Sequence, residues 1–152
     1  MSLFGGLDVS ASALTAQRLR MDVTAENLAN AETTRAANGQ PYRRKEVVLQ
    51  SAQTNGFATA LAAATGGATG AGGSQQAGGV EVAQIAQDNS PPRMVYDPGS
   101  PDSNTQGYVA MPNVNTVTEM TDMITATRAY EANATAIQAV KGEAQHALDI
   151  LR

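Results

Sequence analysis

Near the N-terminus, apolar residues return every seven positions, and neither Gly nor Pro interrupts the chain from Asp8 to Asn30. This spacing places side chains on one face of a long helix, and the set is Leu7, Leu14, Met21 and Leu28. A second apolar set lies roughly opposite at ~100° per residue, namely Val9, Ala16, Leu19 and Val23. The pattern predicts a helix that needs neighbours on two sides, which favours packing between molecules over a purely intramolecular core.

A second helical pattern runs from Val114 to Leu151, where only Gly142 interrupts it. A line of mostly apolar residues along one face, which we call the seam, advances in alternating steps of three and four residues. It consists of Met123, Ala126, Tyr130, Asn133, Ile137, Val140, Ala144, Ala147 and Leu151. A helix of this length would reach about 55 Å at ~1.5 Å per residue, and should project from a domain of this size. We expect the two terminal helices to pair in an antiparallel manner, with the termini close together and the β segment at one end.

Between the helices the sequence changes to turn-forming residues and short strands. The first helix should end near residue 31, because short polar side chains compete there for backbone hydrogen bonds, namely Asn27, Asn30, Thr33 and Thr34. Asn38-Gly39 can supply a turn, and strands are predicted at 42–49, 80–85, 94–96 and 107–111. Residues 56–79 hold 8 Gly and 8 Ala in 24 residues without a charge, which predicts a flexible loop.

These elements predict an α+β fold in which the long terminal helices pair as a coiled-coil-like domain. The chain divides into an N-terminal helical segment at 1–35, a β-rich middle at 36–112 and a C-terminal helical segment at 113–152. Of the 152 residues, Leu, Ile, Val and Phe supply only 26, whereas Ala supplies 28. This predicts a thin core that needs partners.

Charge and composition exclude several functional classes. The net charge of −4 argues against binding to nucleic acid or to anionic membranes, because neutralising phosphates requires clustered Lys and Arg. Without cysteine, neither a disulfide framework nor a thiolate metal site can form. No stretch resembles a cleaved signal peptide or a membrane span of roughly 20 apolar residues. If the protein leaves the cytoplasm, another route must carry it.

Candidate catalytic and metal chemistry is weak. His146 has Glu143 and Asp149 three residues to either side, but it is the only histidine, and a solvated polar face explains it better. The Gly-rich tract lacks the Lys-Ser/Thr ending of a phosphate loop, and prolines break the ligand spacing of a calcium loop at 97–104. We therefore expect no catalytic residue, no cofactor and no metal.

Two other patterns have ordinary explanations. The sequence YRRK at 42–45 could stack on and neutralise nucleic acid, but contact with protein or protection of a strand edge is the better interpretation. The sequence NAT at 133–135 matches a glycosylation acceptor, yet it falls on the helical seam, where a glycan would block packing. Neither pattern defines a site.

Several motifs resemble those of bacterial flagellar basal-body rod proteins, in their proximal-rod branch. The N-terminal likeness consists of LTAQRLRMDVTAENLAN at 14–30, TTR at 33–35 and PYRRK at 41–45. The C-terminal likeness consists of GYV at 107–109, PNVN at 112–115, EM at 119–120 and RAYEAN at 128–133, with VYDP at 95–98 between them. The sequence departs from the usual pattern at Glu26 and Asn104.

This resemblance implies a non-enzymatic subunit of a hollow drive shaft that crosses the periplasm and transmits torque. It also implies export through the flagellar type III export apparatus without a cleaved signal peptide. The implied partners are other copies of the chain, other proximal and distal rod proteins, and an adaptor between the rod and the membrane ring. The alternatives are a helical-hairpin adaptor or type III secreted effector, and a small hydrolase.

On the rod hypothesis, residues on the helical seams bind partners. The predicted partner-binding residues are Leu7, Leu14, Met21, Asn27, Leu28, Asn30, Met120, Met123, Tyr130, Asn133, Ile137, Val140, Leu148 and Leu151. Because a thin seam offsets little of the ~1–2 kcal/mol of backbone entropy per residue, the two ends of the chain, which form the terminal helices, should be only partly ordered before assembly. Folding on docking would prevent premature polymerisation.

Overall fold

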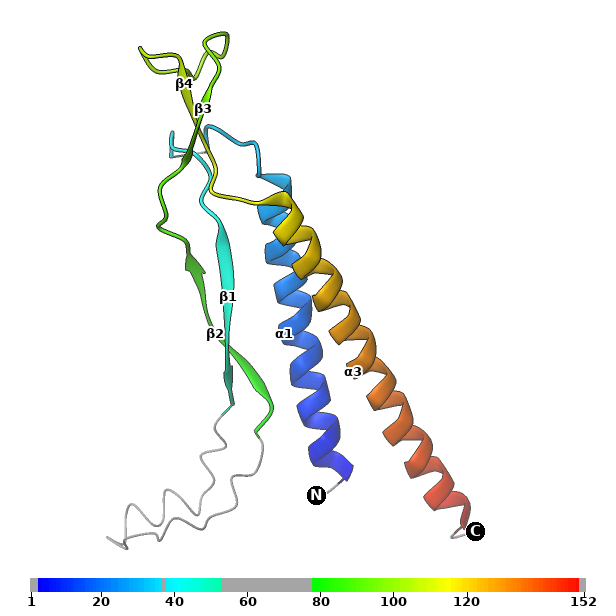
Figure 1. The fold of residues 1–152 in the computed structure, drawn as a ribbon. Helices are drawn as coiled ribbons and strands as arrows, with labels where there is room; N and C mark the ends of the chain where they lie inside the picture. The colour runs from blue at the N-terminus through cyan, green and yellow to red at the C-terminus, as the bar shows by residue number, and fades with distance from the viewer. Residues whose placement is uncertain (1–2, 37, 53–77, 151–152) are drawn as a thin grey trace, which may run out of the picture.

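The computed structural model describes residues 3–36, 38–52 and 78–150, which form an elongated molecule (Figure 1). The elements in chain order are α1 (Leu3–Ala29), β1 (Lys45–Ser51), β2 (Val80–Gln87), β3 (Arg93–Tyr96), β4 (Tyr108–Met111) and α3 (Thr116–Ile150). The predicted α+β class is confirmed. Most of the predicted flexible loop, residues 56–77, lies outside the described residues. Among the described helices, none has the combination of length and apolar character needed to cross a membrane.

The two helices pack side by side in opposite directions. The N-terminal end of α1 and the C-terminal end of α3 therefore lie at the same end of the molecule (Figure 1). Their pairing confirms the antiparallel hairpin predicted from the seams. α3 begins where Asn115 caps it, because the Oδ1 atom of Asn115 accepts hydrogen bonds from the backbone N–H groups of Val117 and Thr118 at 3.0 and 3.4 Å. α3 then diverges from α1 towards its C-terminal end.

α1 ends as predicted, but only part of the predicted polar set ends it. The Asn30 side chain donates to the carbonyl of Glu26 at 2.9 Å and accepts from the Thr33 hydroxyl at 3.2 Å. The prediction for Asn27 is wrong, because its side chain leaves its own helix and bonds to β1 and α3. Asn27 therefore joins elements instead of ending one.

The β1–β2 hairpin lies along α1, and the expectation that the whole β segment sits at one end is wrong for this hairpin (Figure 1). Its strands are antiparallel, with Val47 opposite Ile85, and the register shifts between Val48 and Leu49. At its lower end the backbone N–H of Val80 donates to the Ser12 hydroxyl at 3.0 Å. Gly79 precedes this contact with a φ of 75°, and any larger side chain there would collide with Ser12.

The hairpin explains why α1 is apolar on two sides. Ala16 and Val23, from the second apolar set, are buried, and Val23 lines the space between α1 and β1. Met21, from the first set, contacts α3, where its sulfur accepts a hydrogen bond from the Thr127 hydroxyl at 3.5 Å. Two-sided apolarity thus has neighbours within the chain, and by itself it does not require another molecule.

The β3–β4 hairpin forms the tip of the molecule. Val95 pairs with Val109, and the rings of Tyr96 and Tyr108 meet edge to face at 5.3 Å between centroids. The loop between the two strands is fastened to the segment after α1, because Asp102 accepts a bond from the Thr34 hydroxyl at 2.7 Å and pairs with Arg35 at 2.8 Å. Only this hairpin occupies the end position expected for the β segment.

Candidate functional site

A buried polar cluster joins α1, β1 and α3, and it consists of Asn27, Tyr42, Arg44 and Glu119. Asn27 and Glu119 are each only 1 % exposed. The Asn27 Nδ2 atom donates to Glu119 Oε2 at 3.0 Å and to the carbonyl of Lys45 at 2.8 Å. Its Oδ1 atom accepts from the backbone N–H of Lys45 and the Tyr42 hydroxyl, both at 2.9 Å. One asparagine of α1 therefore satisfies groups on two other segments, residues 42–45 and Glu119, that are distant in sequence from each other.

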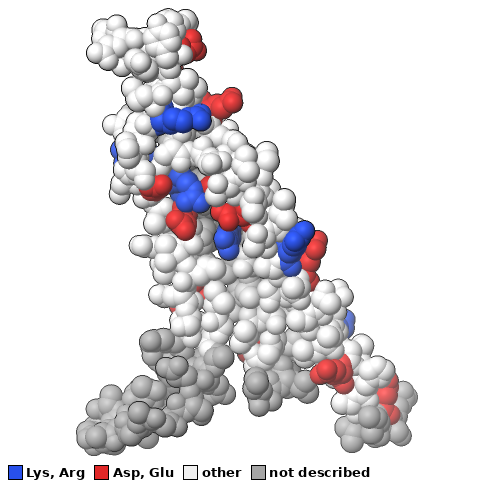
Figure 2. All heavy atoms as spheres, viewed as in Figure 1, with Lys and Arg blue, Asp and Glu red and all other residues white. Residues whose placement is uncertain are grey.

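Arg44 supplies the charge that allows Glu119 to be buried. Its Nε atom lies 2.6 Å from Glu119 Oε1, and this hydrogen bond raises the pKa of Arg44. Weaker ion pairs surround it, from Arg44 to Glu46 at 3.5 Å and to Asp122 at 3.7 Å. Figure 2 shows basic and acidic side chains next to one another around the middle of the visible face. Because an unpaired buried charge is strongly destabilising, the cluster favours one register of α1, β1 and α3.

The Tyr42 hydroxyl belongs to the same cluster and is protected from ionisation. Its pKa is raised to about 12, mainly because burial separates it from water and further because Glu26 and Glu119 are negatively charged. The protonated hydroxyl is the form that donates to Asn27. The folded protein therefore holds this proton more tightly than the unfolded chain does.

This difference predicts a loss of stability in alkali. The unfolded chain ionises Tyr42 near its ordinary pKa of 10.0, so the stabilisation is complete below pH 10 and is lost as the pH rises through about 12. The free energy of unfolding, measured by urea titration, should fall less steeply with pH over this range in Tyr42→Phe than in the wild type. Tyr130→Phe, which alters a tyrosine outside the cluster, should keep the wild-type slope. Equal slopes for all three proteins would contradict the assignment.

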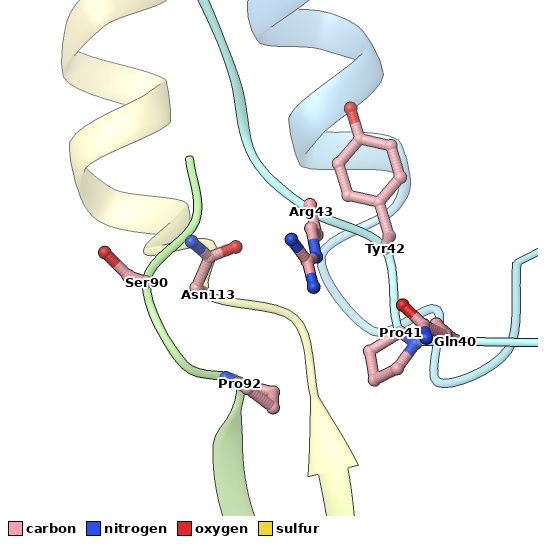
Figure 3. A pocket seen from close by; sticks show the side chains of 7 residues that line it. All are labelled: Gln40, Pro41, Tyr42, Arg43, Ser90, Pro92 and Asn113. Atoms are coloured by element: carbon pink, nitrogen blue, oxygen red, sulfur yellow. The ribbon is translucent and has the colours of Figure 1, made fainter. Parts of the chain in front are cut away.

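A groove lies where three linkers come together beside the cluster (Figure 3). Its walls are Gln40, Pro41, Tyr42, Arg43, Ser90, Pro92 and Asn113. Figure 3 shows the Arg43 guanidinium reaching between the linkers towards Asn113, whereas the Tyr42 ring points away towards α1. Arg43 donates to Asn89 at 3.0 Å, and the backbone N–H of Arg44 donates to the Asn113 side chain at 3.0 Å. These bonds tie the linkers together, so the groove is a structural junction.

The side chains of the tetrapeptide at 42–45 bond to other parts of the same chain. Only Lys45 lies within β1, so the predicted start of the strand at residue 42 is three residues too early. Tyr42 and Arg44 point into the cluster, and the Lys45 ammonium pairs with Glu26 at 2.5 Å. Its three basic side chains thus serve interactions within the chain.

The predicted partner-binding residues fall into three groups. Half-buried along the paired helices are Leu7, Leu14, Met21, Leu28, Asn30, Met123, Asn133, Ile137 and Val140, while Met120, Tyr130 and Leu148 are exposed. Asn27 is enclosed by the chain itself, and Leu151 lies outside the described residues. The seam that faces α1 is covered in its first part and open near its C-terminal end.

Sequence reasoning missed the partnership of Arg44 and Glu119, although both lie in motifs that carry the family resemblance. The only sequence features that pointed to this ion pair were a glutamate near the start of a helix rich in Ala and Thr, and a run of three basic residues. Neither feature identifies its partner 75 residues away. His146 is exposed, and no three His, Asp or Glu side chains of the described residues are grouped in a way that could hold a metal ion.

Comparison with known families places the paired helices in a defined class of protein. Residues 7–36 match the family described as flagella basal body rod protein, and residues 105–150 match the flagellar basal body rod FlgEFG protein C-terminal family. These two segments contain most of α1, all of α3, and the cluster residues Asn27 and Glu119. The class is that of the structural proteins of the flagellar rod.

Relatives that match nearly the full length of the chain identify the family within this class. The flagellar basal-body rod protein FlgC of Bacillus subtilis is 50% identical over 99% of both chains. FlgC of Borreliella burgdorferi is 43% identical over 100% of this chain and 99% of its own, and FlgC of Salmonella typhimurium is 41% identical over 93% and 92%. The chain belongs to the FlgC family of flagellar basal-body rod proteins. It is a structural rod subunit of the flagellar basal body and not an enzyme.

Proposed function

We propose that this chain is a subunit of the proximal rod, and that the exposed parts of its terminal helices assemble it into a hollow helical shaft. Stiff, packed helices would then transmit torque along the shaft. The buried cluster supports this role, because it fixes the helices to the β1–β2 hairpin through bonds that a sheared subunit would have to break. The role requires mechanical continuity and no chemical step.

The observation that carries the proposal is the uncovered end of α3. With 35 residues α3 is ~52 Å long, whereas the 27 residues of α1 span ~40 Å. Apart from Gly142, every side chain described from Lys141 to Asp149 is exposed, and Leu148 is 67 % exposed. The seam positions Ala144 and Ala147 therefore extend the α1-facing side of α3 beyond the part that α1 covers. A neighbouring subunit would cover them in an assembled rod.

The remaining parts of the proposal concern location and partners. Rod subunits of this kind would act in the periplasmic space and reach it through the flagellar type III export apparatus, without a cleaved signal peptide. Their neighbours would be copies of the chain, other proximal and distal rod proteins, and an adaptor to the membrane ring. The names of the FlgC relatives, which specify the basal-body rod, support this setting.

Charge substitutions in the seam test the proposal. Met21→Asp and Ile137→Asp each place a carboxylate on a half-buried seam position, and each should stop rod completion and swimming. The measurement is motility on soft agar together with electron microscopy of isolated basal bodies. A soluble adaptor would instead lose one pairwise interaction and leave the basal bodies intact. Normal swimming in both variants would refute the proposal.

Hydrogen exchange on the isolated chain tests the proposed coupling of folding to assembly. Amides near Asn27 and Glu119 should exchange slowly, because the cluster holds both helices there. Amides from Lys141 to Asp149 should exchange at nearly the rate of an unfolded chain, and should become protected in assembled rods. Strong protection along the full length of both helices in the monomer would contradict folding on docking.

A further inference from the structure

The first part of α3 carries large apolar side chains on the side that faces away from α1. Val117, Met120 and Ile124 are 70 %, 51 % and 55 % exposed, and their spacing places them on one face of the helix. Ala126, on the opposite side of α3, is completely buried. We call the three exposed residues the α3 stripe, and its exposure means that nothing in the described part of the chain covers it.

α1 has one side that remains free after α3 and the β1–β2 hairpin have packed against the other two. The exposed residues on this side include Ala11, Arg18, Asp22, Ala25 and Ala29, which share one face at ~100° per residue. We call this set the α1 outer face. Its alanines leave a smooth surface into which larger side chains can pack.

The charges beside the two surfaces are complementary. Arg128 and Glu131 follow the α3 stripe on the same face, while Arg18 and Asp22 lie on the α1 outer face. None of the four forms an ion pair with any other residue that the structure describes. If a second α1 lies antiparallel to α3, Asp22 meets Arg128 and Arg18 meets Glu131. The same alignment places Ile124 opposite Ala25 and Met120 opposite Ala29.

From this match we propose that the α3 stripe of one copy packs on the α1 outer face of a second copy. The inference rests on the proposed rod function and specifies one of its contacts. Because α1 and α3 are antiparallel within each chain, the two copies point in the same direction. The contact uses different surfaces on the two copies, so it can repeat without closing into a dimer and can generate a ring or a helical tube.

The alignment also sets the relative height of the copies. Within one chain, Thr127 of α3 contacts Met21 of α1. Between copies, Arg128 would meet Asp22, one residue further along each helix. The other three pairs are offset by one residue instead of two, so the neighbouring copies are side by side with an axial offset of only ~1.5–3 Å, which is one to two residue rises. In the resulting layer of subunits, each α3 lies between the α1 of its own copy and the α1 of the next copy.

Engineered disulfides test the contact, because the natural chain contains no cysteine. The double variant Ala25→Cys with Ile124→Cys, expressed in the host in place of the wild-type chain, should give a ladder of cross-linked multimers when assembled rods are oxidised. A disulfide forms only when the two Cα atoms are within ~7 Å. The matched control Ala25→Cys with Thr135→Cys uses an exposed position on the same side of α3, ~16 Å further along, and should give no ladder.

The outcomes separate this contact from the proposed function. Incorporation of the chain into basal bodies without a ladder from the first pair would overturn the contact and leave the rod function standing. A cross-link to a different rod protein would overturn the choice of a second copy as the occupant. Absence of the wild-type chain from basal bodies would overturn the proposed function, and this contact with it.

Charge reversal gives an independent test that does not depend on disulfide geometry. Asp22→Arg and Arg128→Asp should each reduce swimming, because each places like charges opposite one another in the contact. The double variant restores the opposite pairing and should recover most of the lost swimming. Glu81→Arg, a reversal on the exposed side of β2, should have no effect. A double variant that swims no better than either single variant would overturn the contact.

Discussion

Glu119→Ala is expected to lower the free energy of unfolding by about 3–5 kcal/mol, the range found when one partner of a buried ion pair is removed. The substitution leaves the Arg44 guanidinium without its carboxylate at 2.6 Å and the Asn27 amide without an acceptor at 3.0 Å. Urea denaturation followed by circular dichroism measures the change. For a domain stabilised by only about 5–15 kcal/mol, such a loss is a large fraction of the total.

The matched control is Glu131→Ala, which removes an exposed carboxylate from the same helix. It should change the free energy of unfolding by less than about 0.5 kcal/mol. A stronger test replaces both charges, because Arg44→Met combined with Glu119→Leu leaves no buried charge unpaired. This double variant should lose less stability than the sum of the two single variants. Equal effects of Glu119→Ala and Glu131→Ala would show that the cluster does not stabilise the fold.

The helices were predictable because their signal is local and long. The predicted turn near residue 31 lies within two residues of the observed end of α1, and the second pattern from Val114 agrees with α3 from Thr116. Three of the four strands also begin within one residue of their predicted start. Repetition over many turns averages out the irregular positions, which is why periodic patterns survive in a sequence of low hydrophobicity.

The neighbours of α1 could not be assigned from the same signal. The second apolar face of α1 predicts that Ala16 and Val23 are covered, but it does not predict which element covers them. The β1–β2 hairpin, whose first strand lies beside Val23, is separated from α1 by linkers whose direction depends on the contacts of Asn27, Tyr42 and Arg44. Tertiary hydrogen bonds of this kind have no periodicity, so a single sequence does not reveal them.

The candidate site shows the same division. The half-buried seam residues such as Ile137 follow from helical spacing, whereas this spacing does not predict that Asn27 and Glu119 are buried together. The exposed Val117 and Ile124 were also missed, because they lie off the seam on the opposite side of α3. A polar residue in an apolar context and an apolar residue on a polar face are both exceptions to the pattern. In this chain the buried exceptions fix the register of the elements, and the exposed ones are the starting point of the proposed contact between copies.

Leu148→Asp is expected to abolish swimming while leaving the isolated chain as stable as the wild type. Leu148 is 67 % exposed, so the change should alter the free energy of unfolding by less than about 0.5 kcal/mol. In an assembled rod the same position would be covered by a neighbouring subunit, and an unpaired carboxylate buried there opposes assembly. Urea titration of the purified chain and motility of the host strain measure the two effects separately.

The control for this separation is Gln145→Asp, which introduces the same charge on a neighbouring turn where a polar side chain is already exposed. It should swim normally if the effect of Leu148→Asp comes from the loss of an apolar contact and not from added charge. A stable monomer together with a non-motile host would separate an assembly defect from a folding defect. Met21→Asp and Ile137→Asp cannot make this separation, because both positions are half-buried in the monomer. Normal swimming of Leu148→Asp would mean that the open end of α3 stays in water within the rod, and that the subunits meet elsewhere.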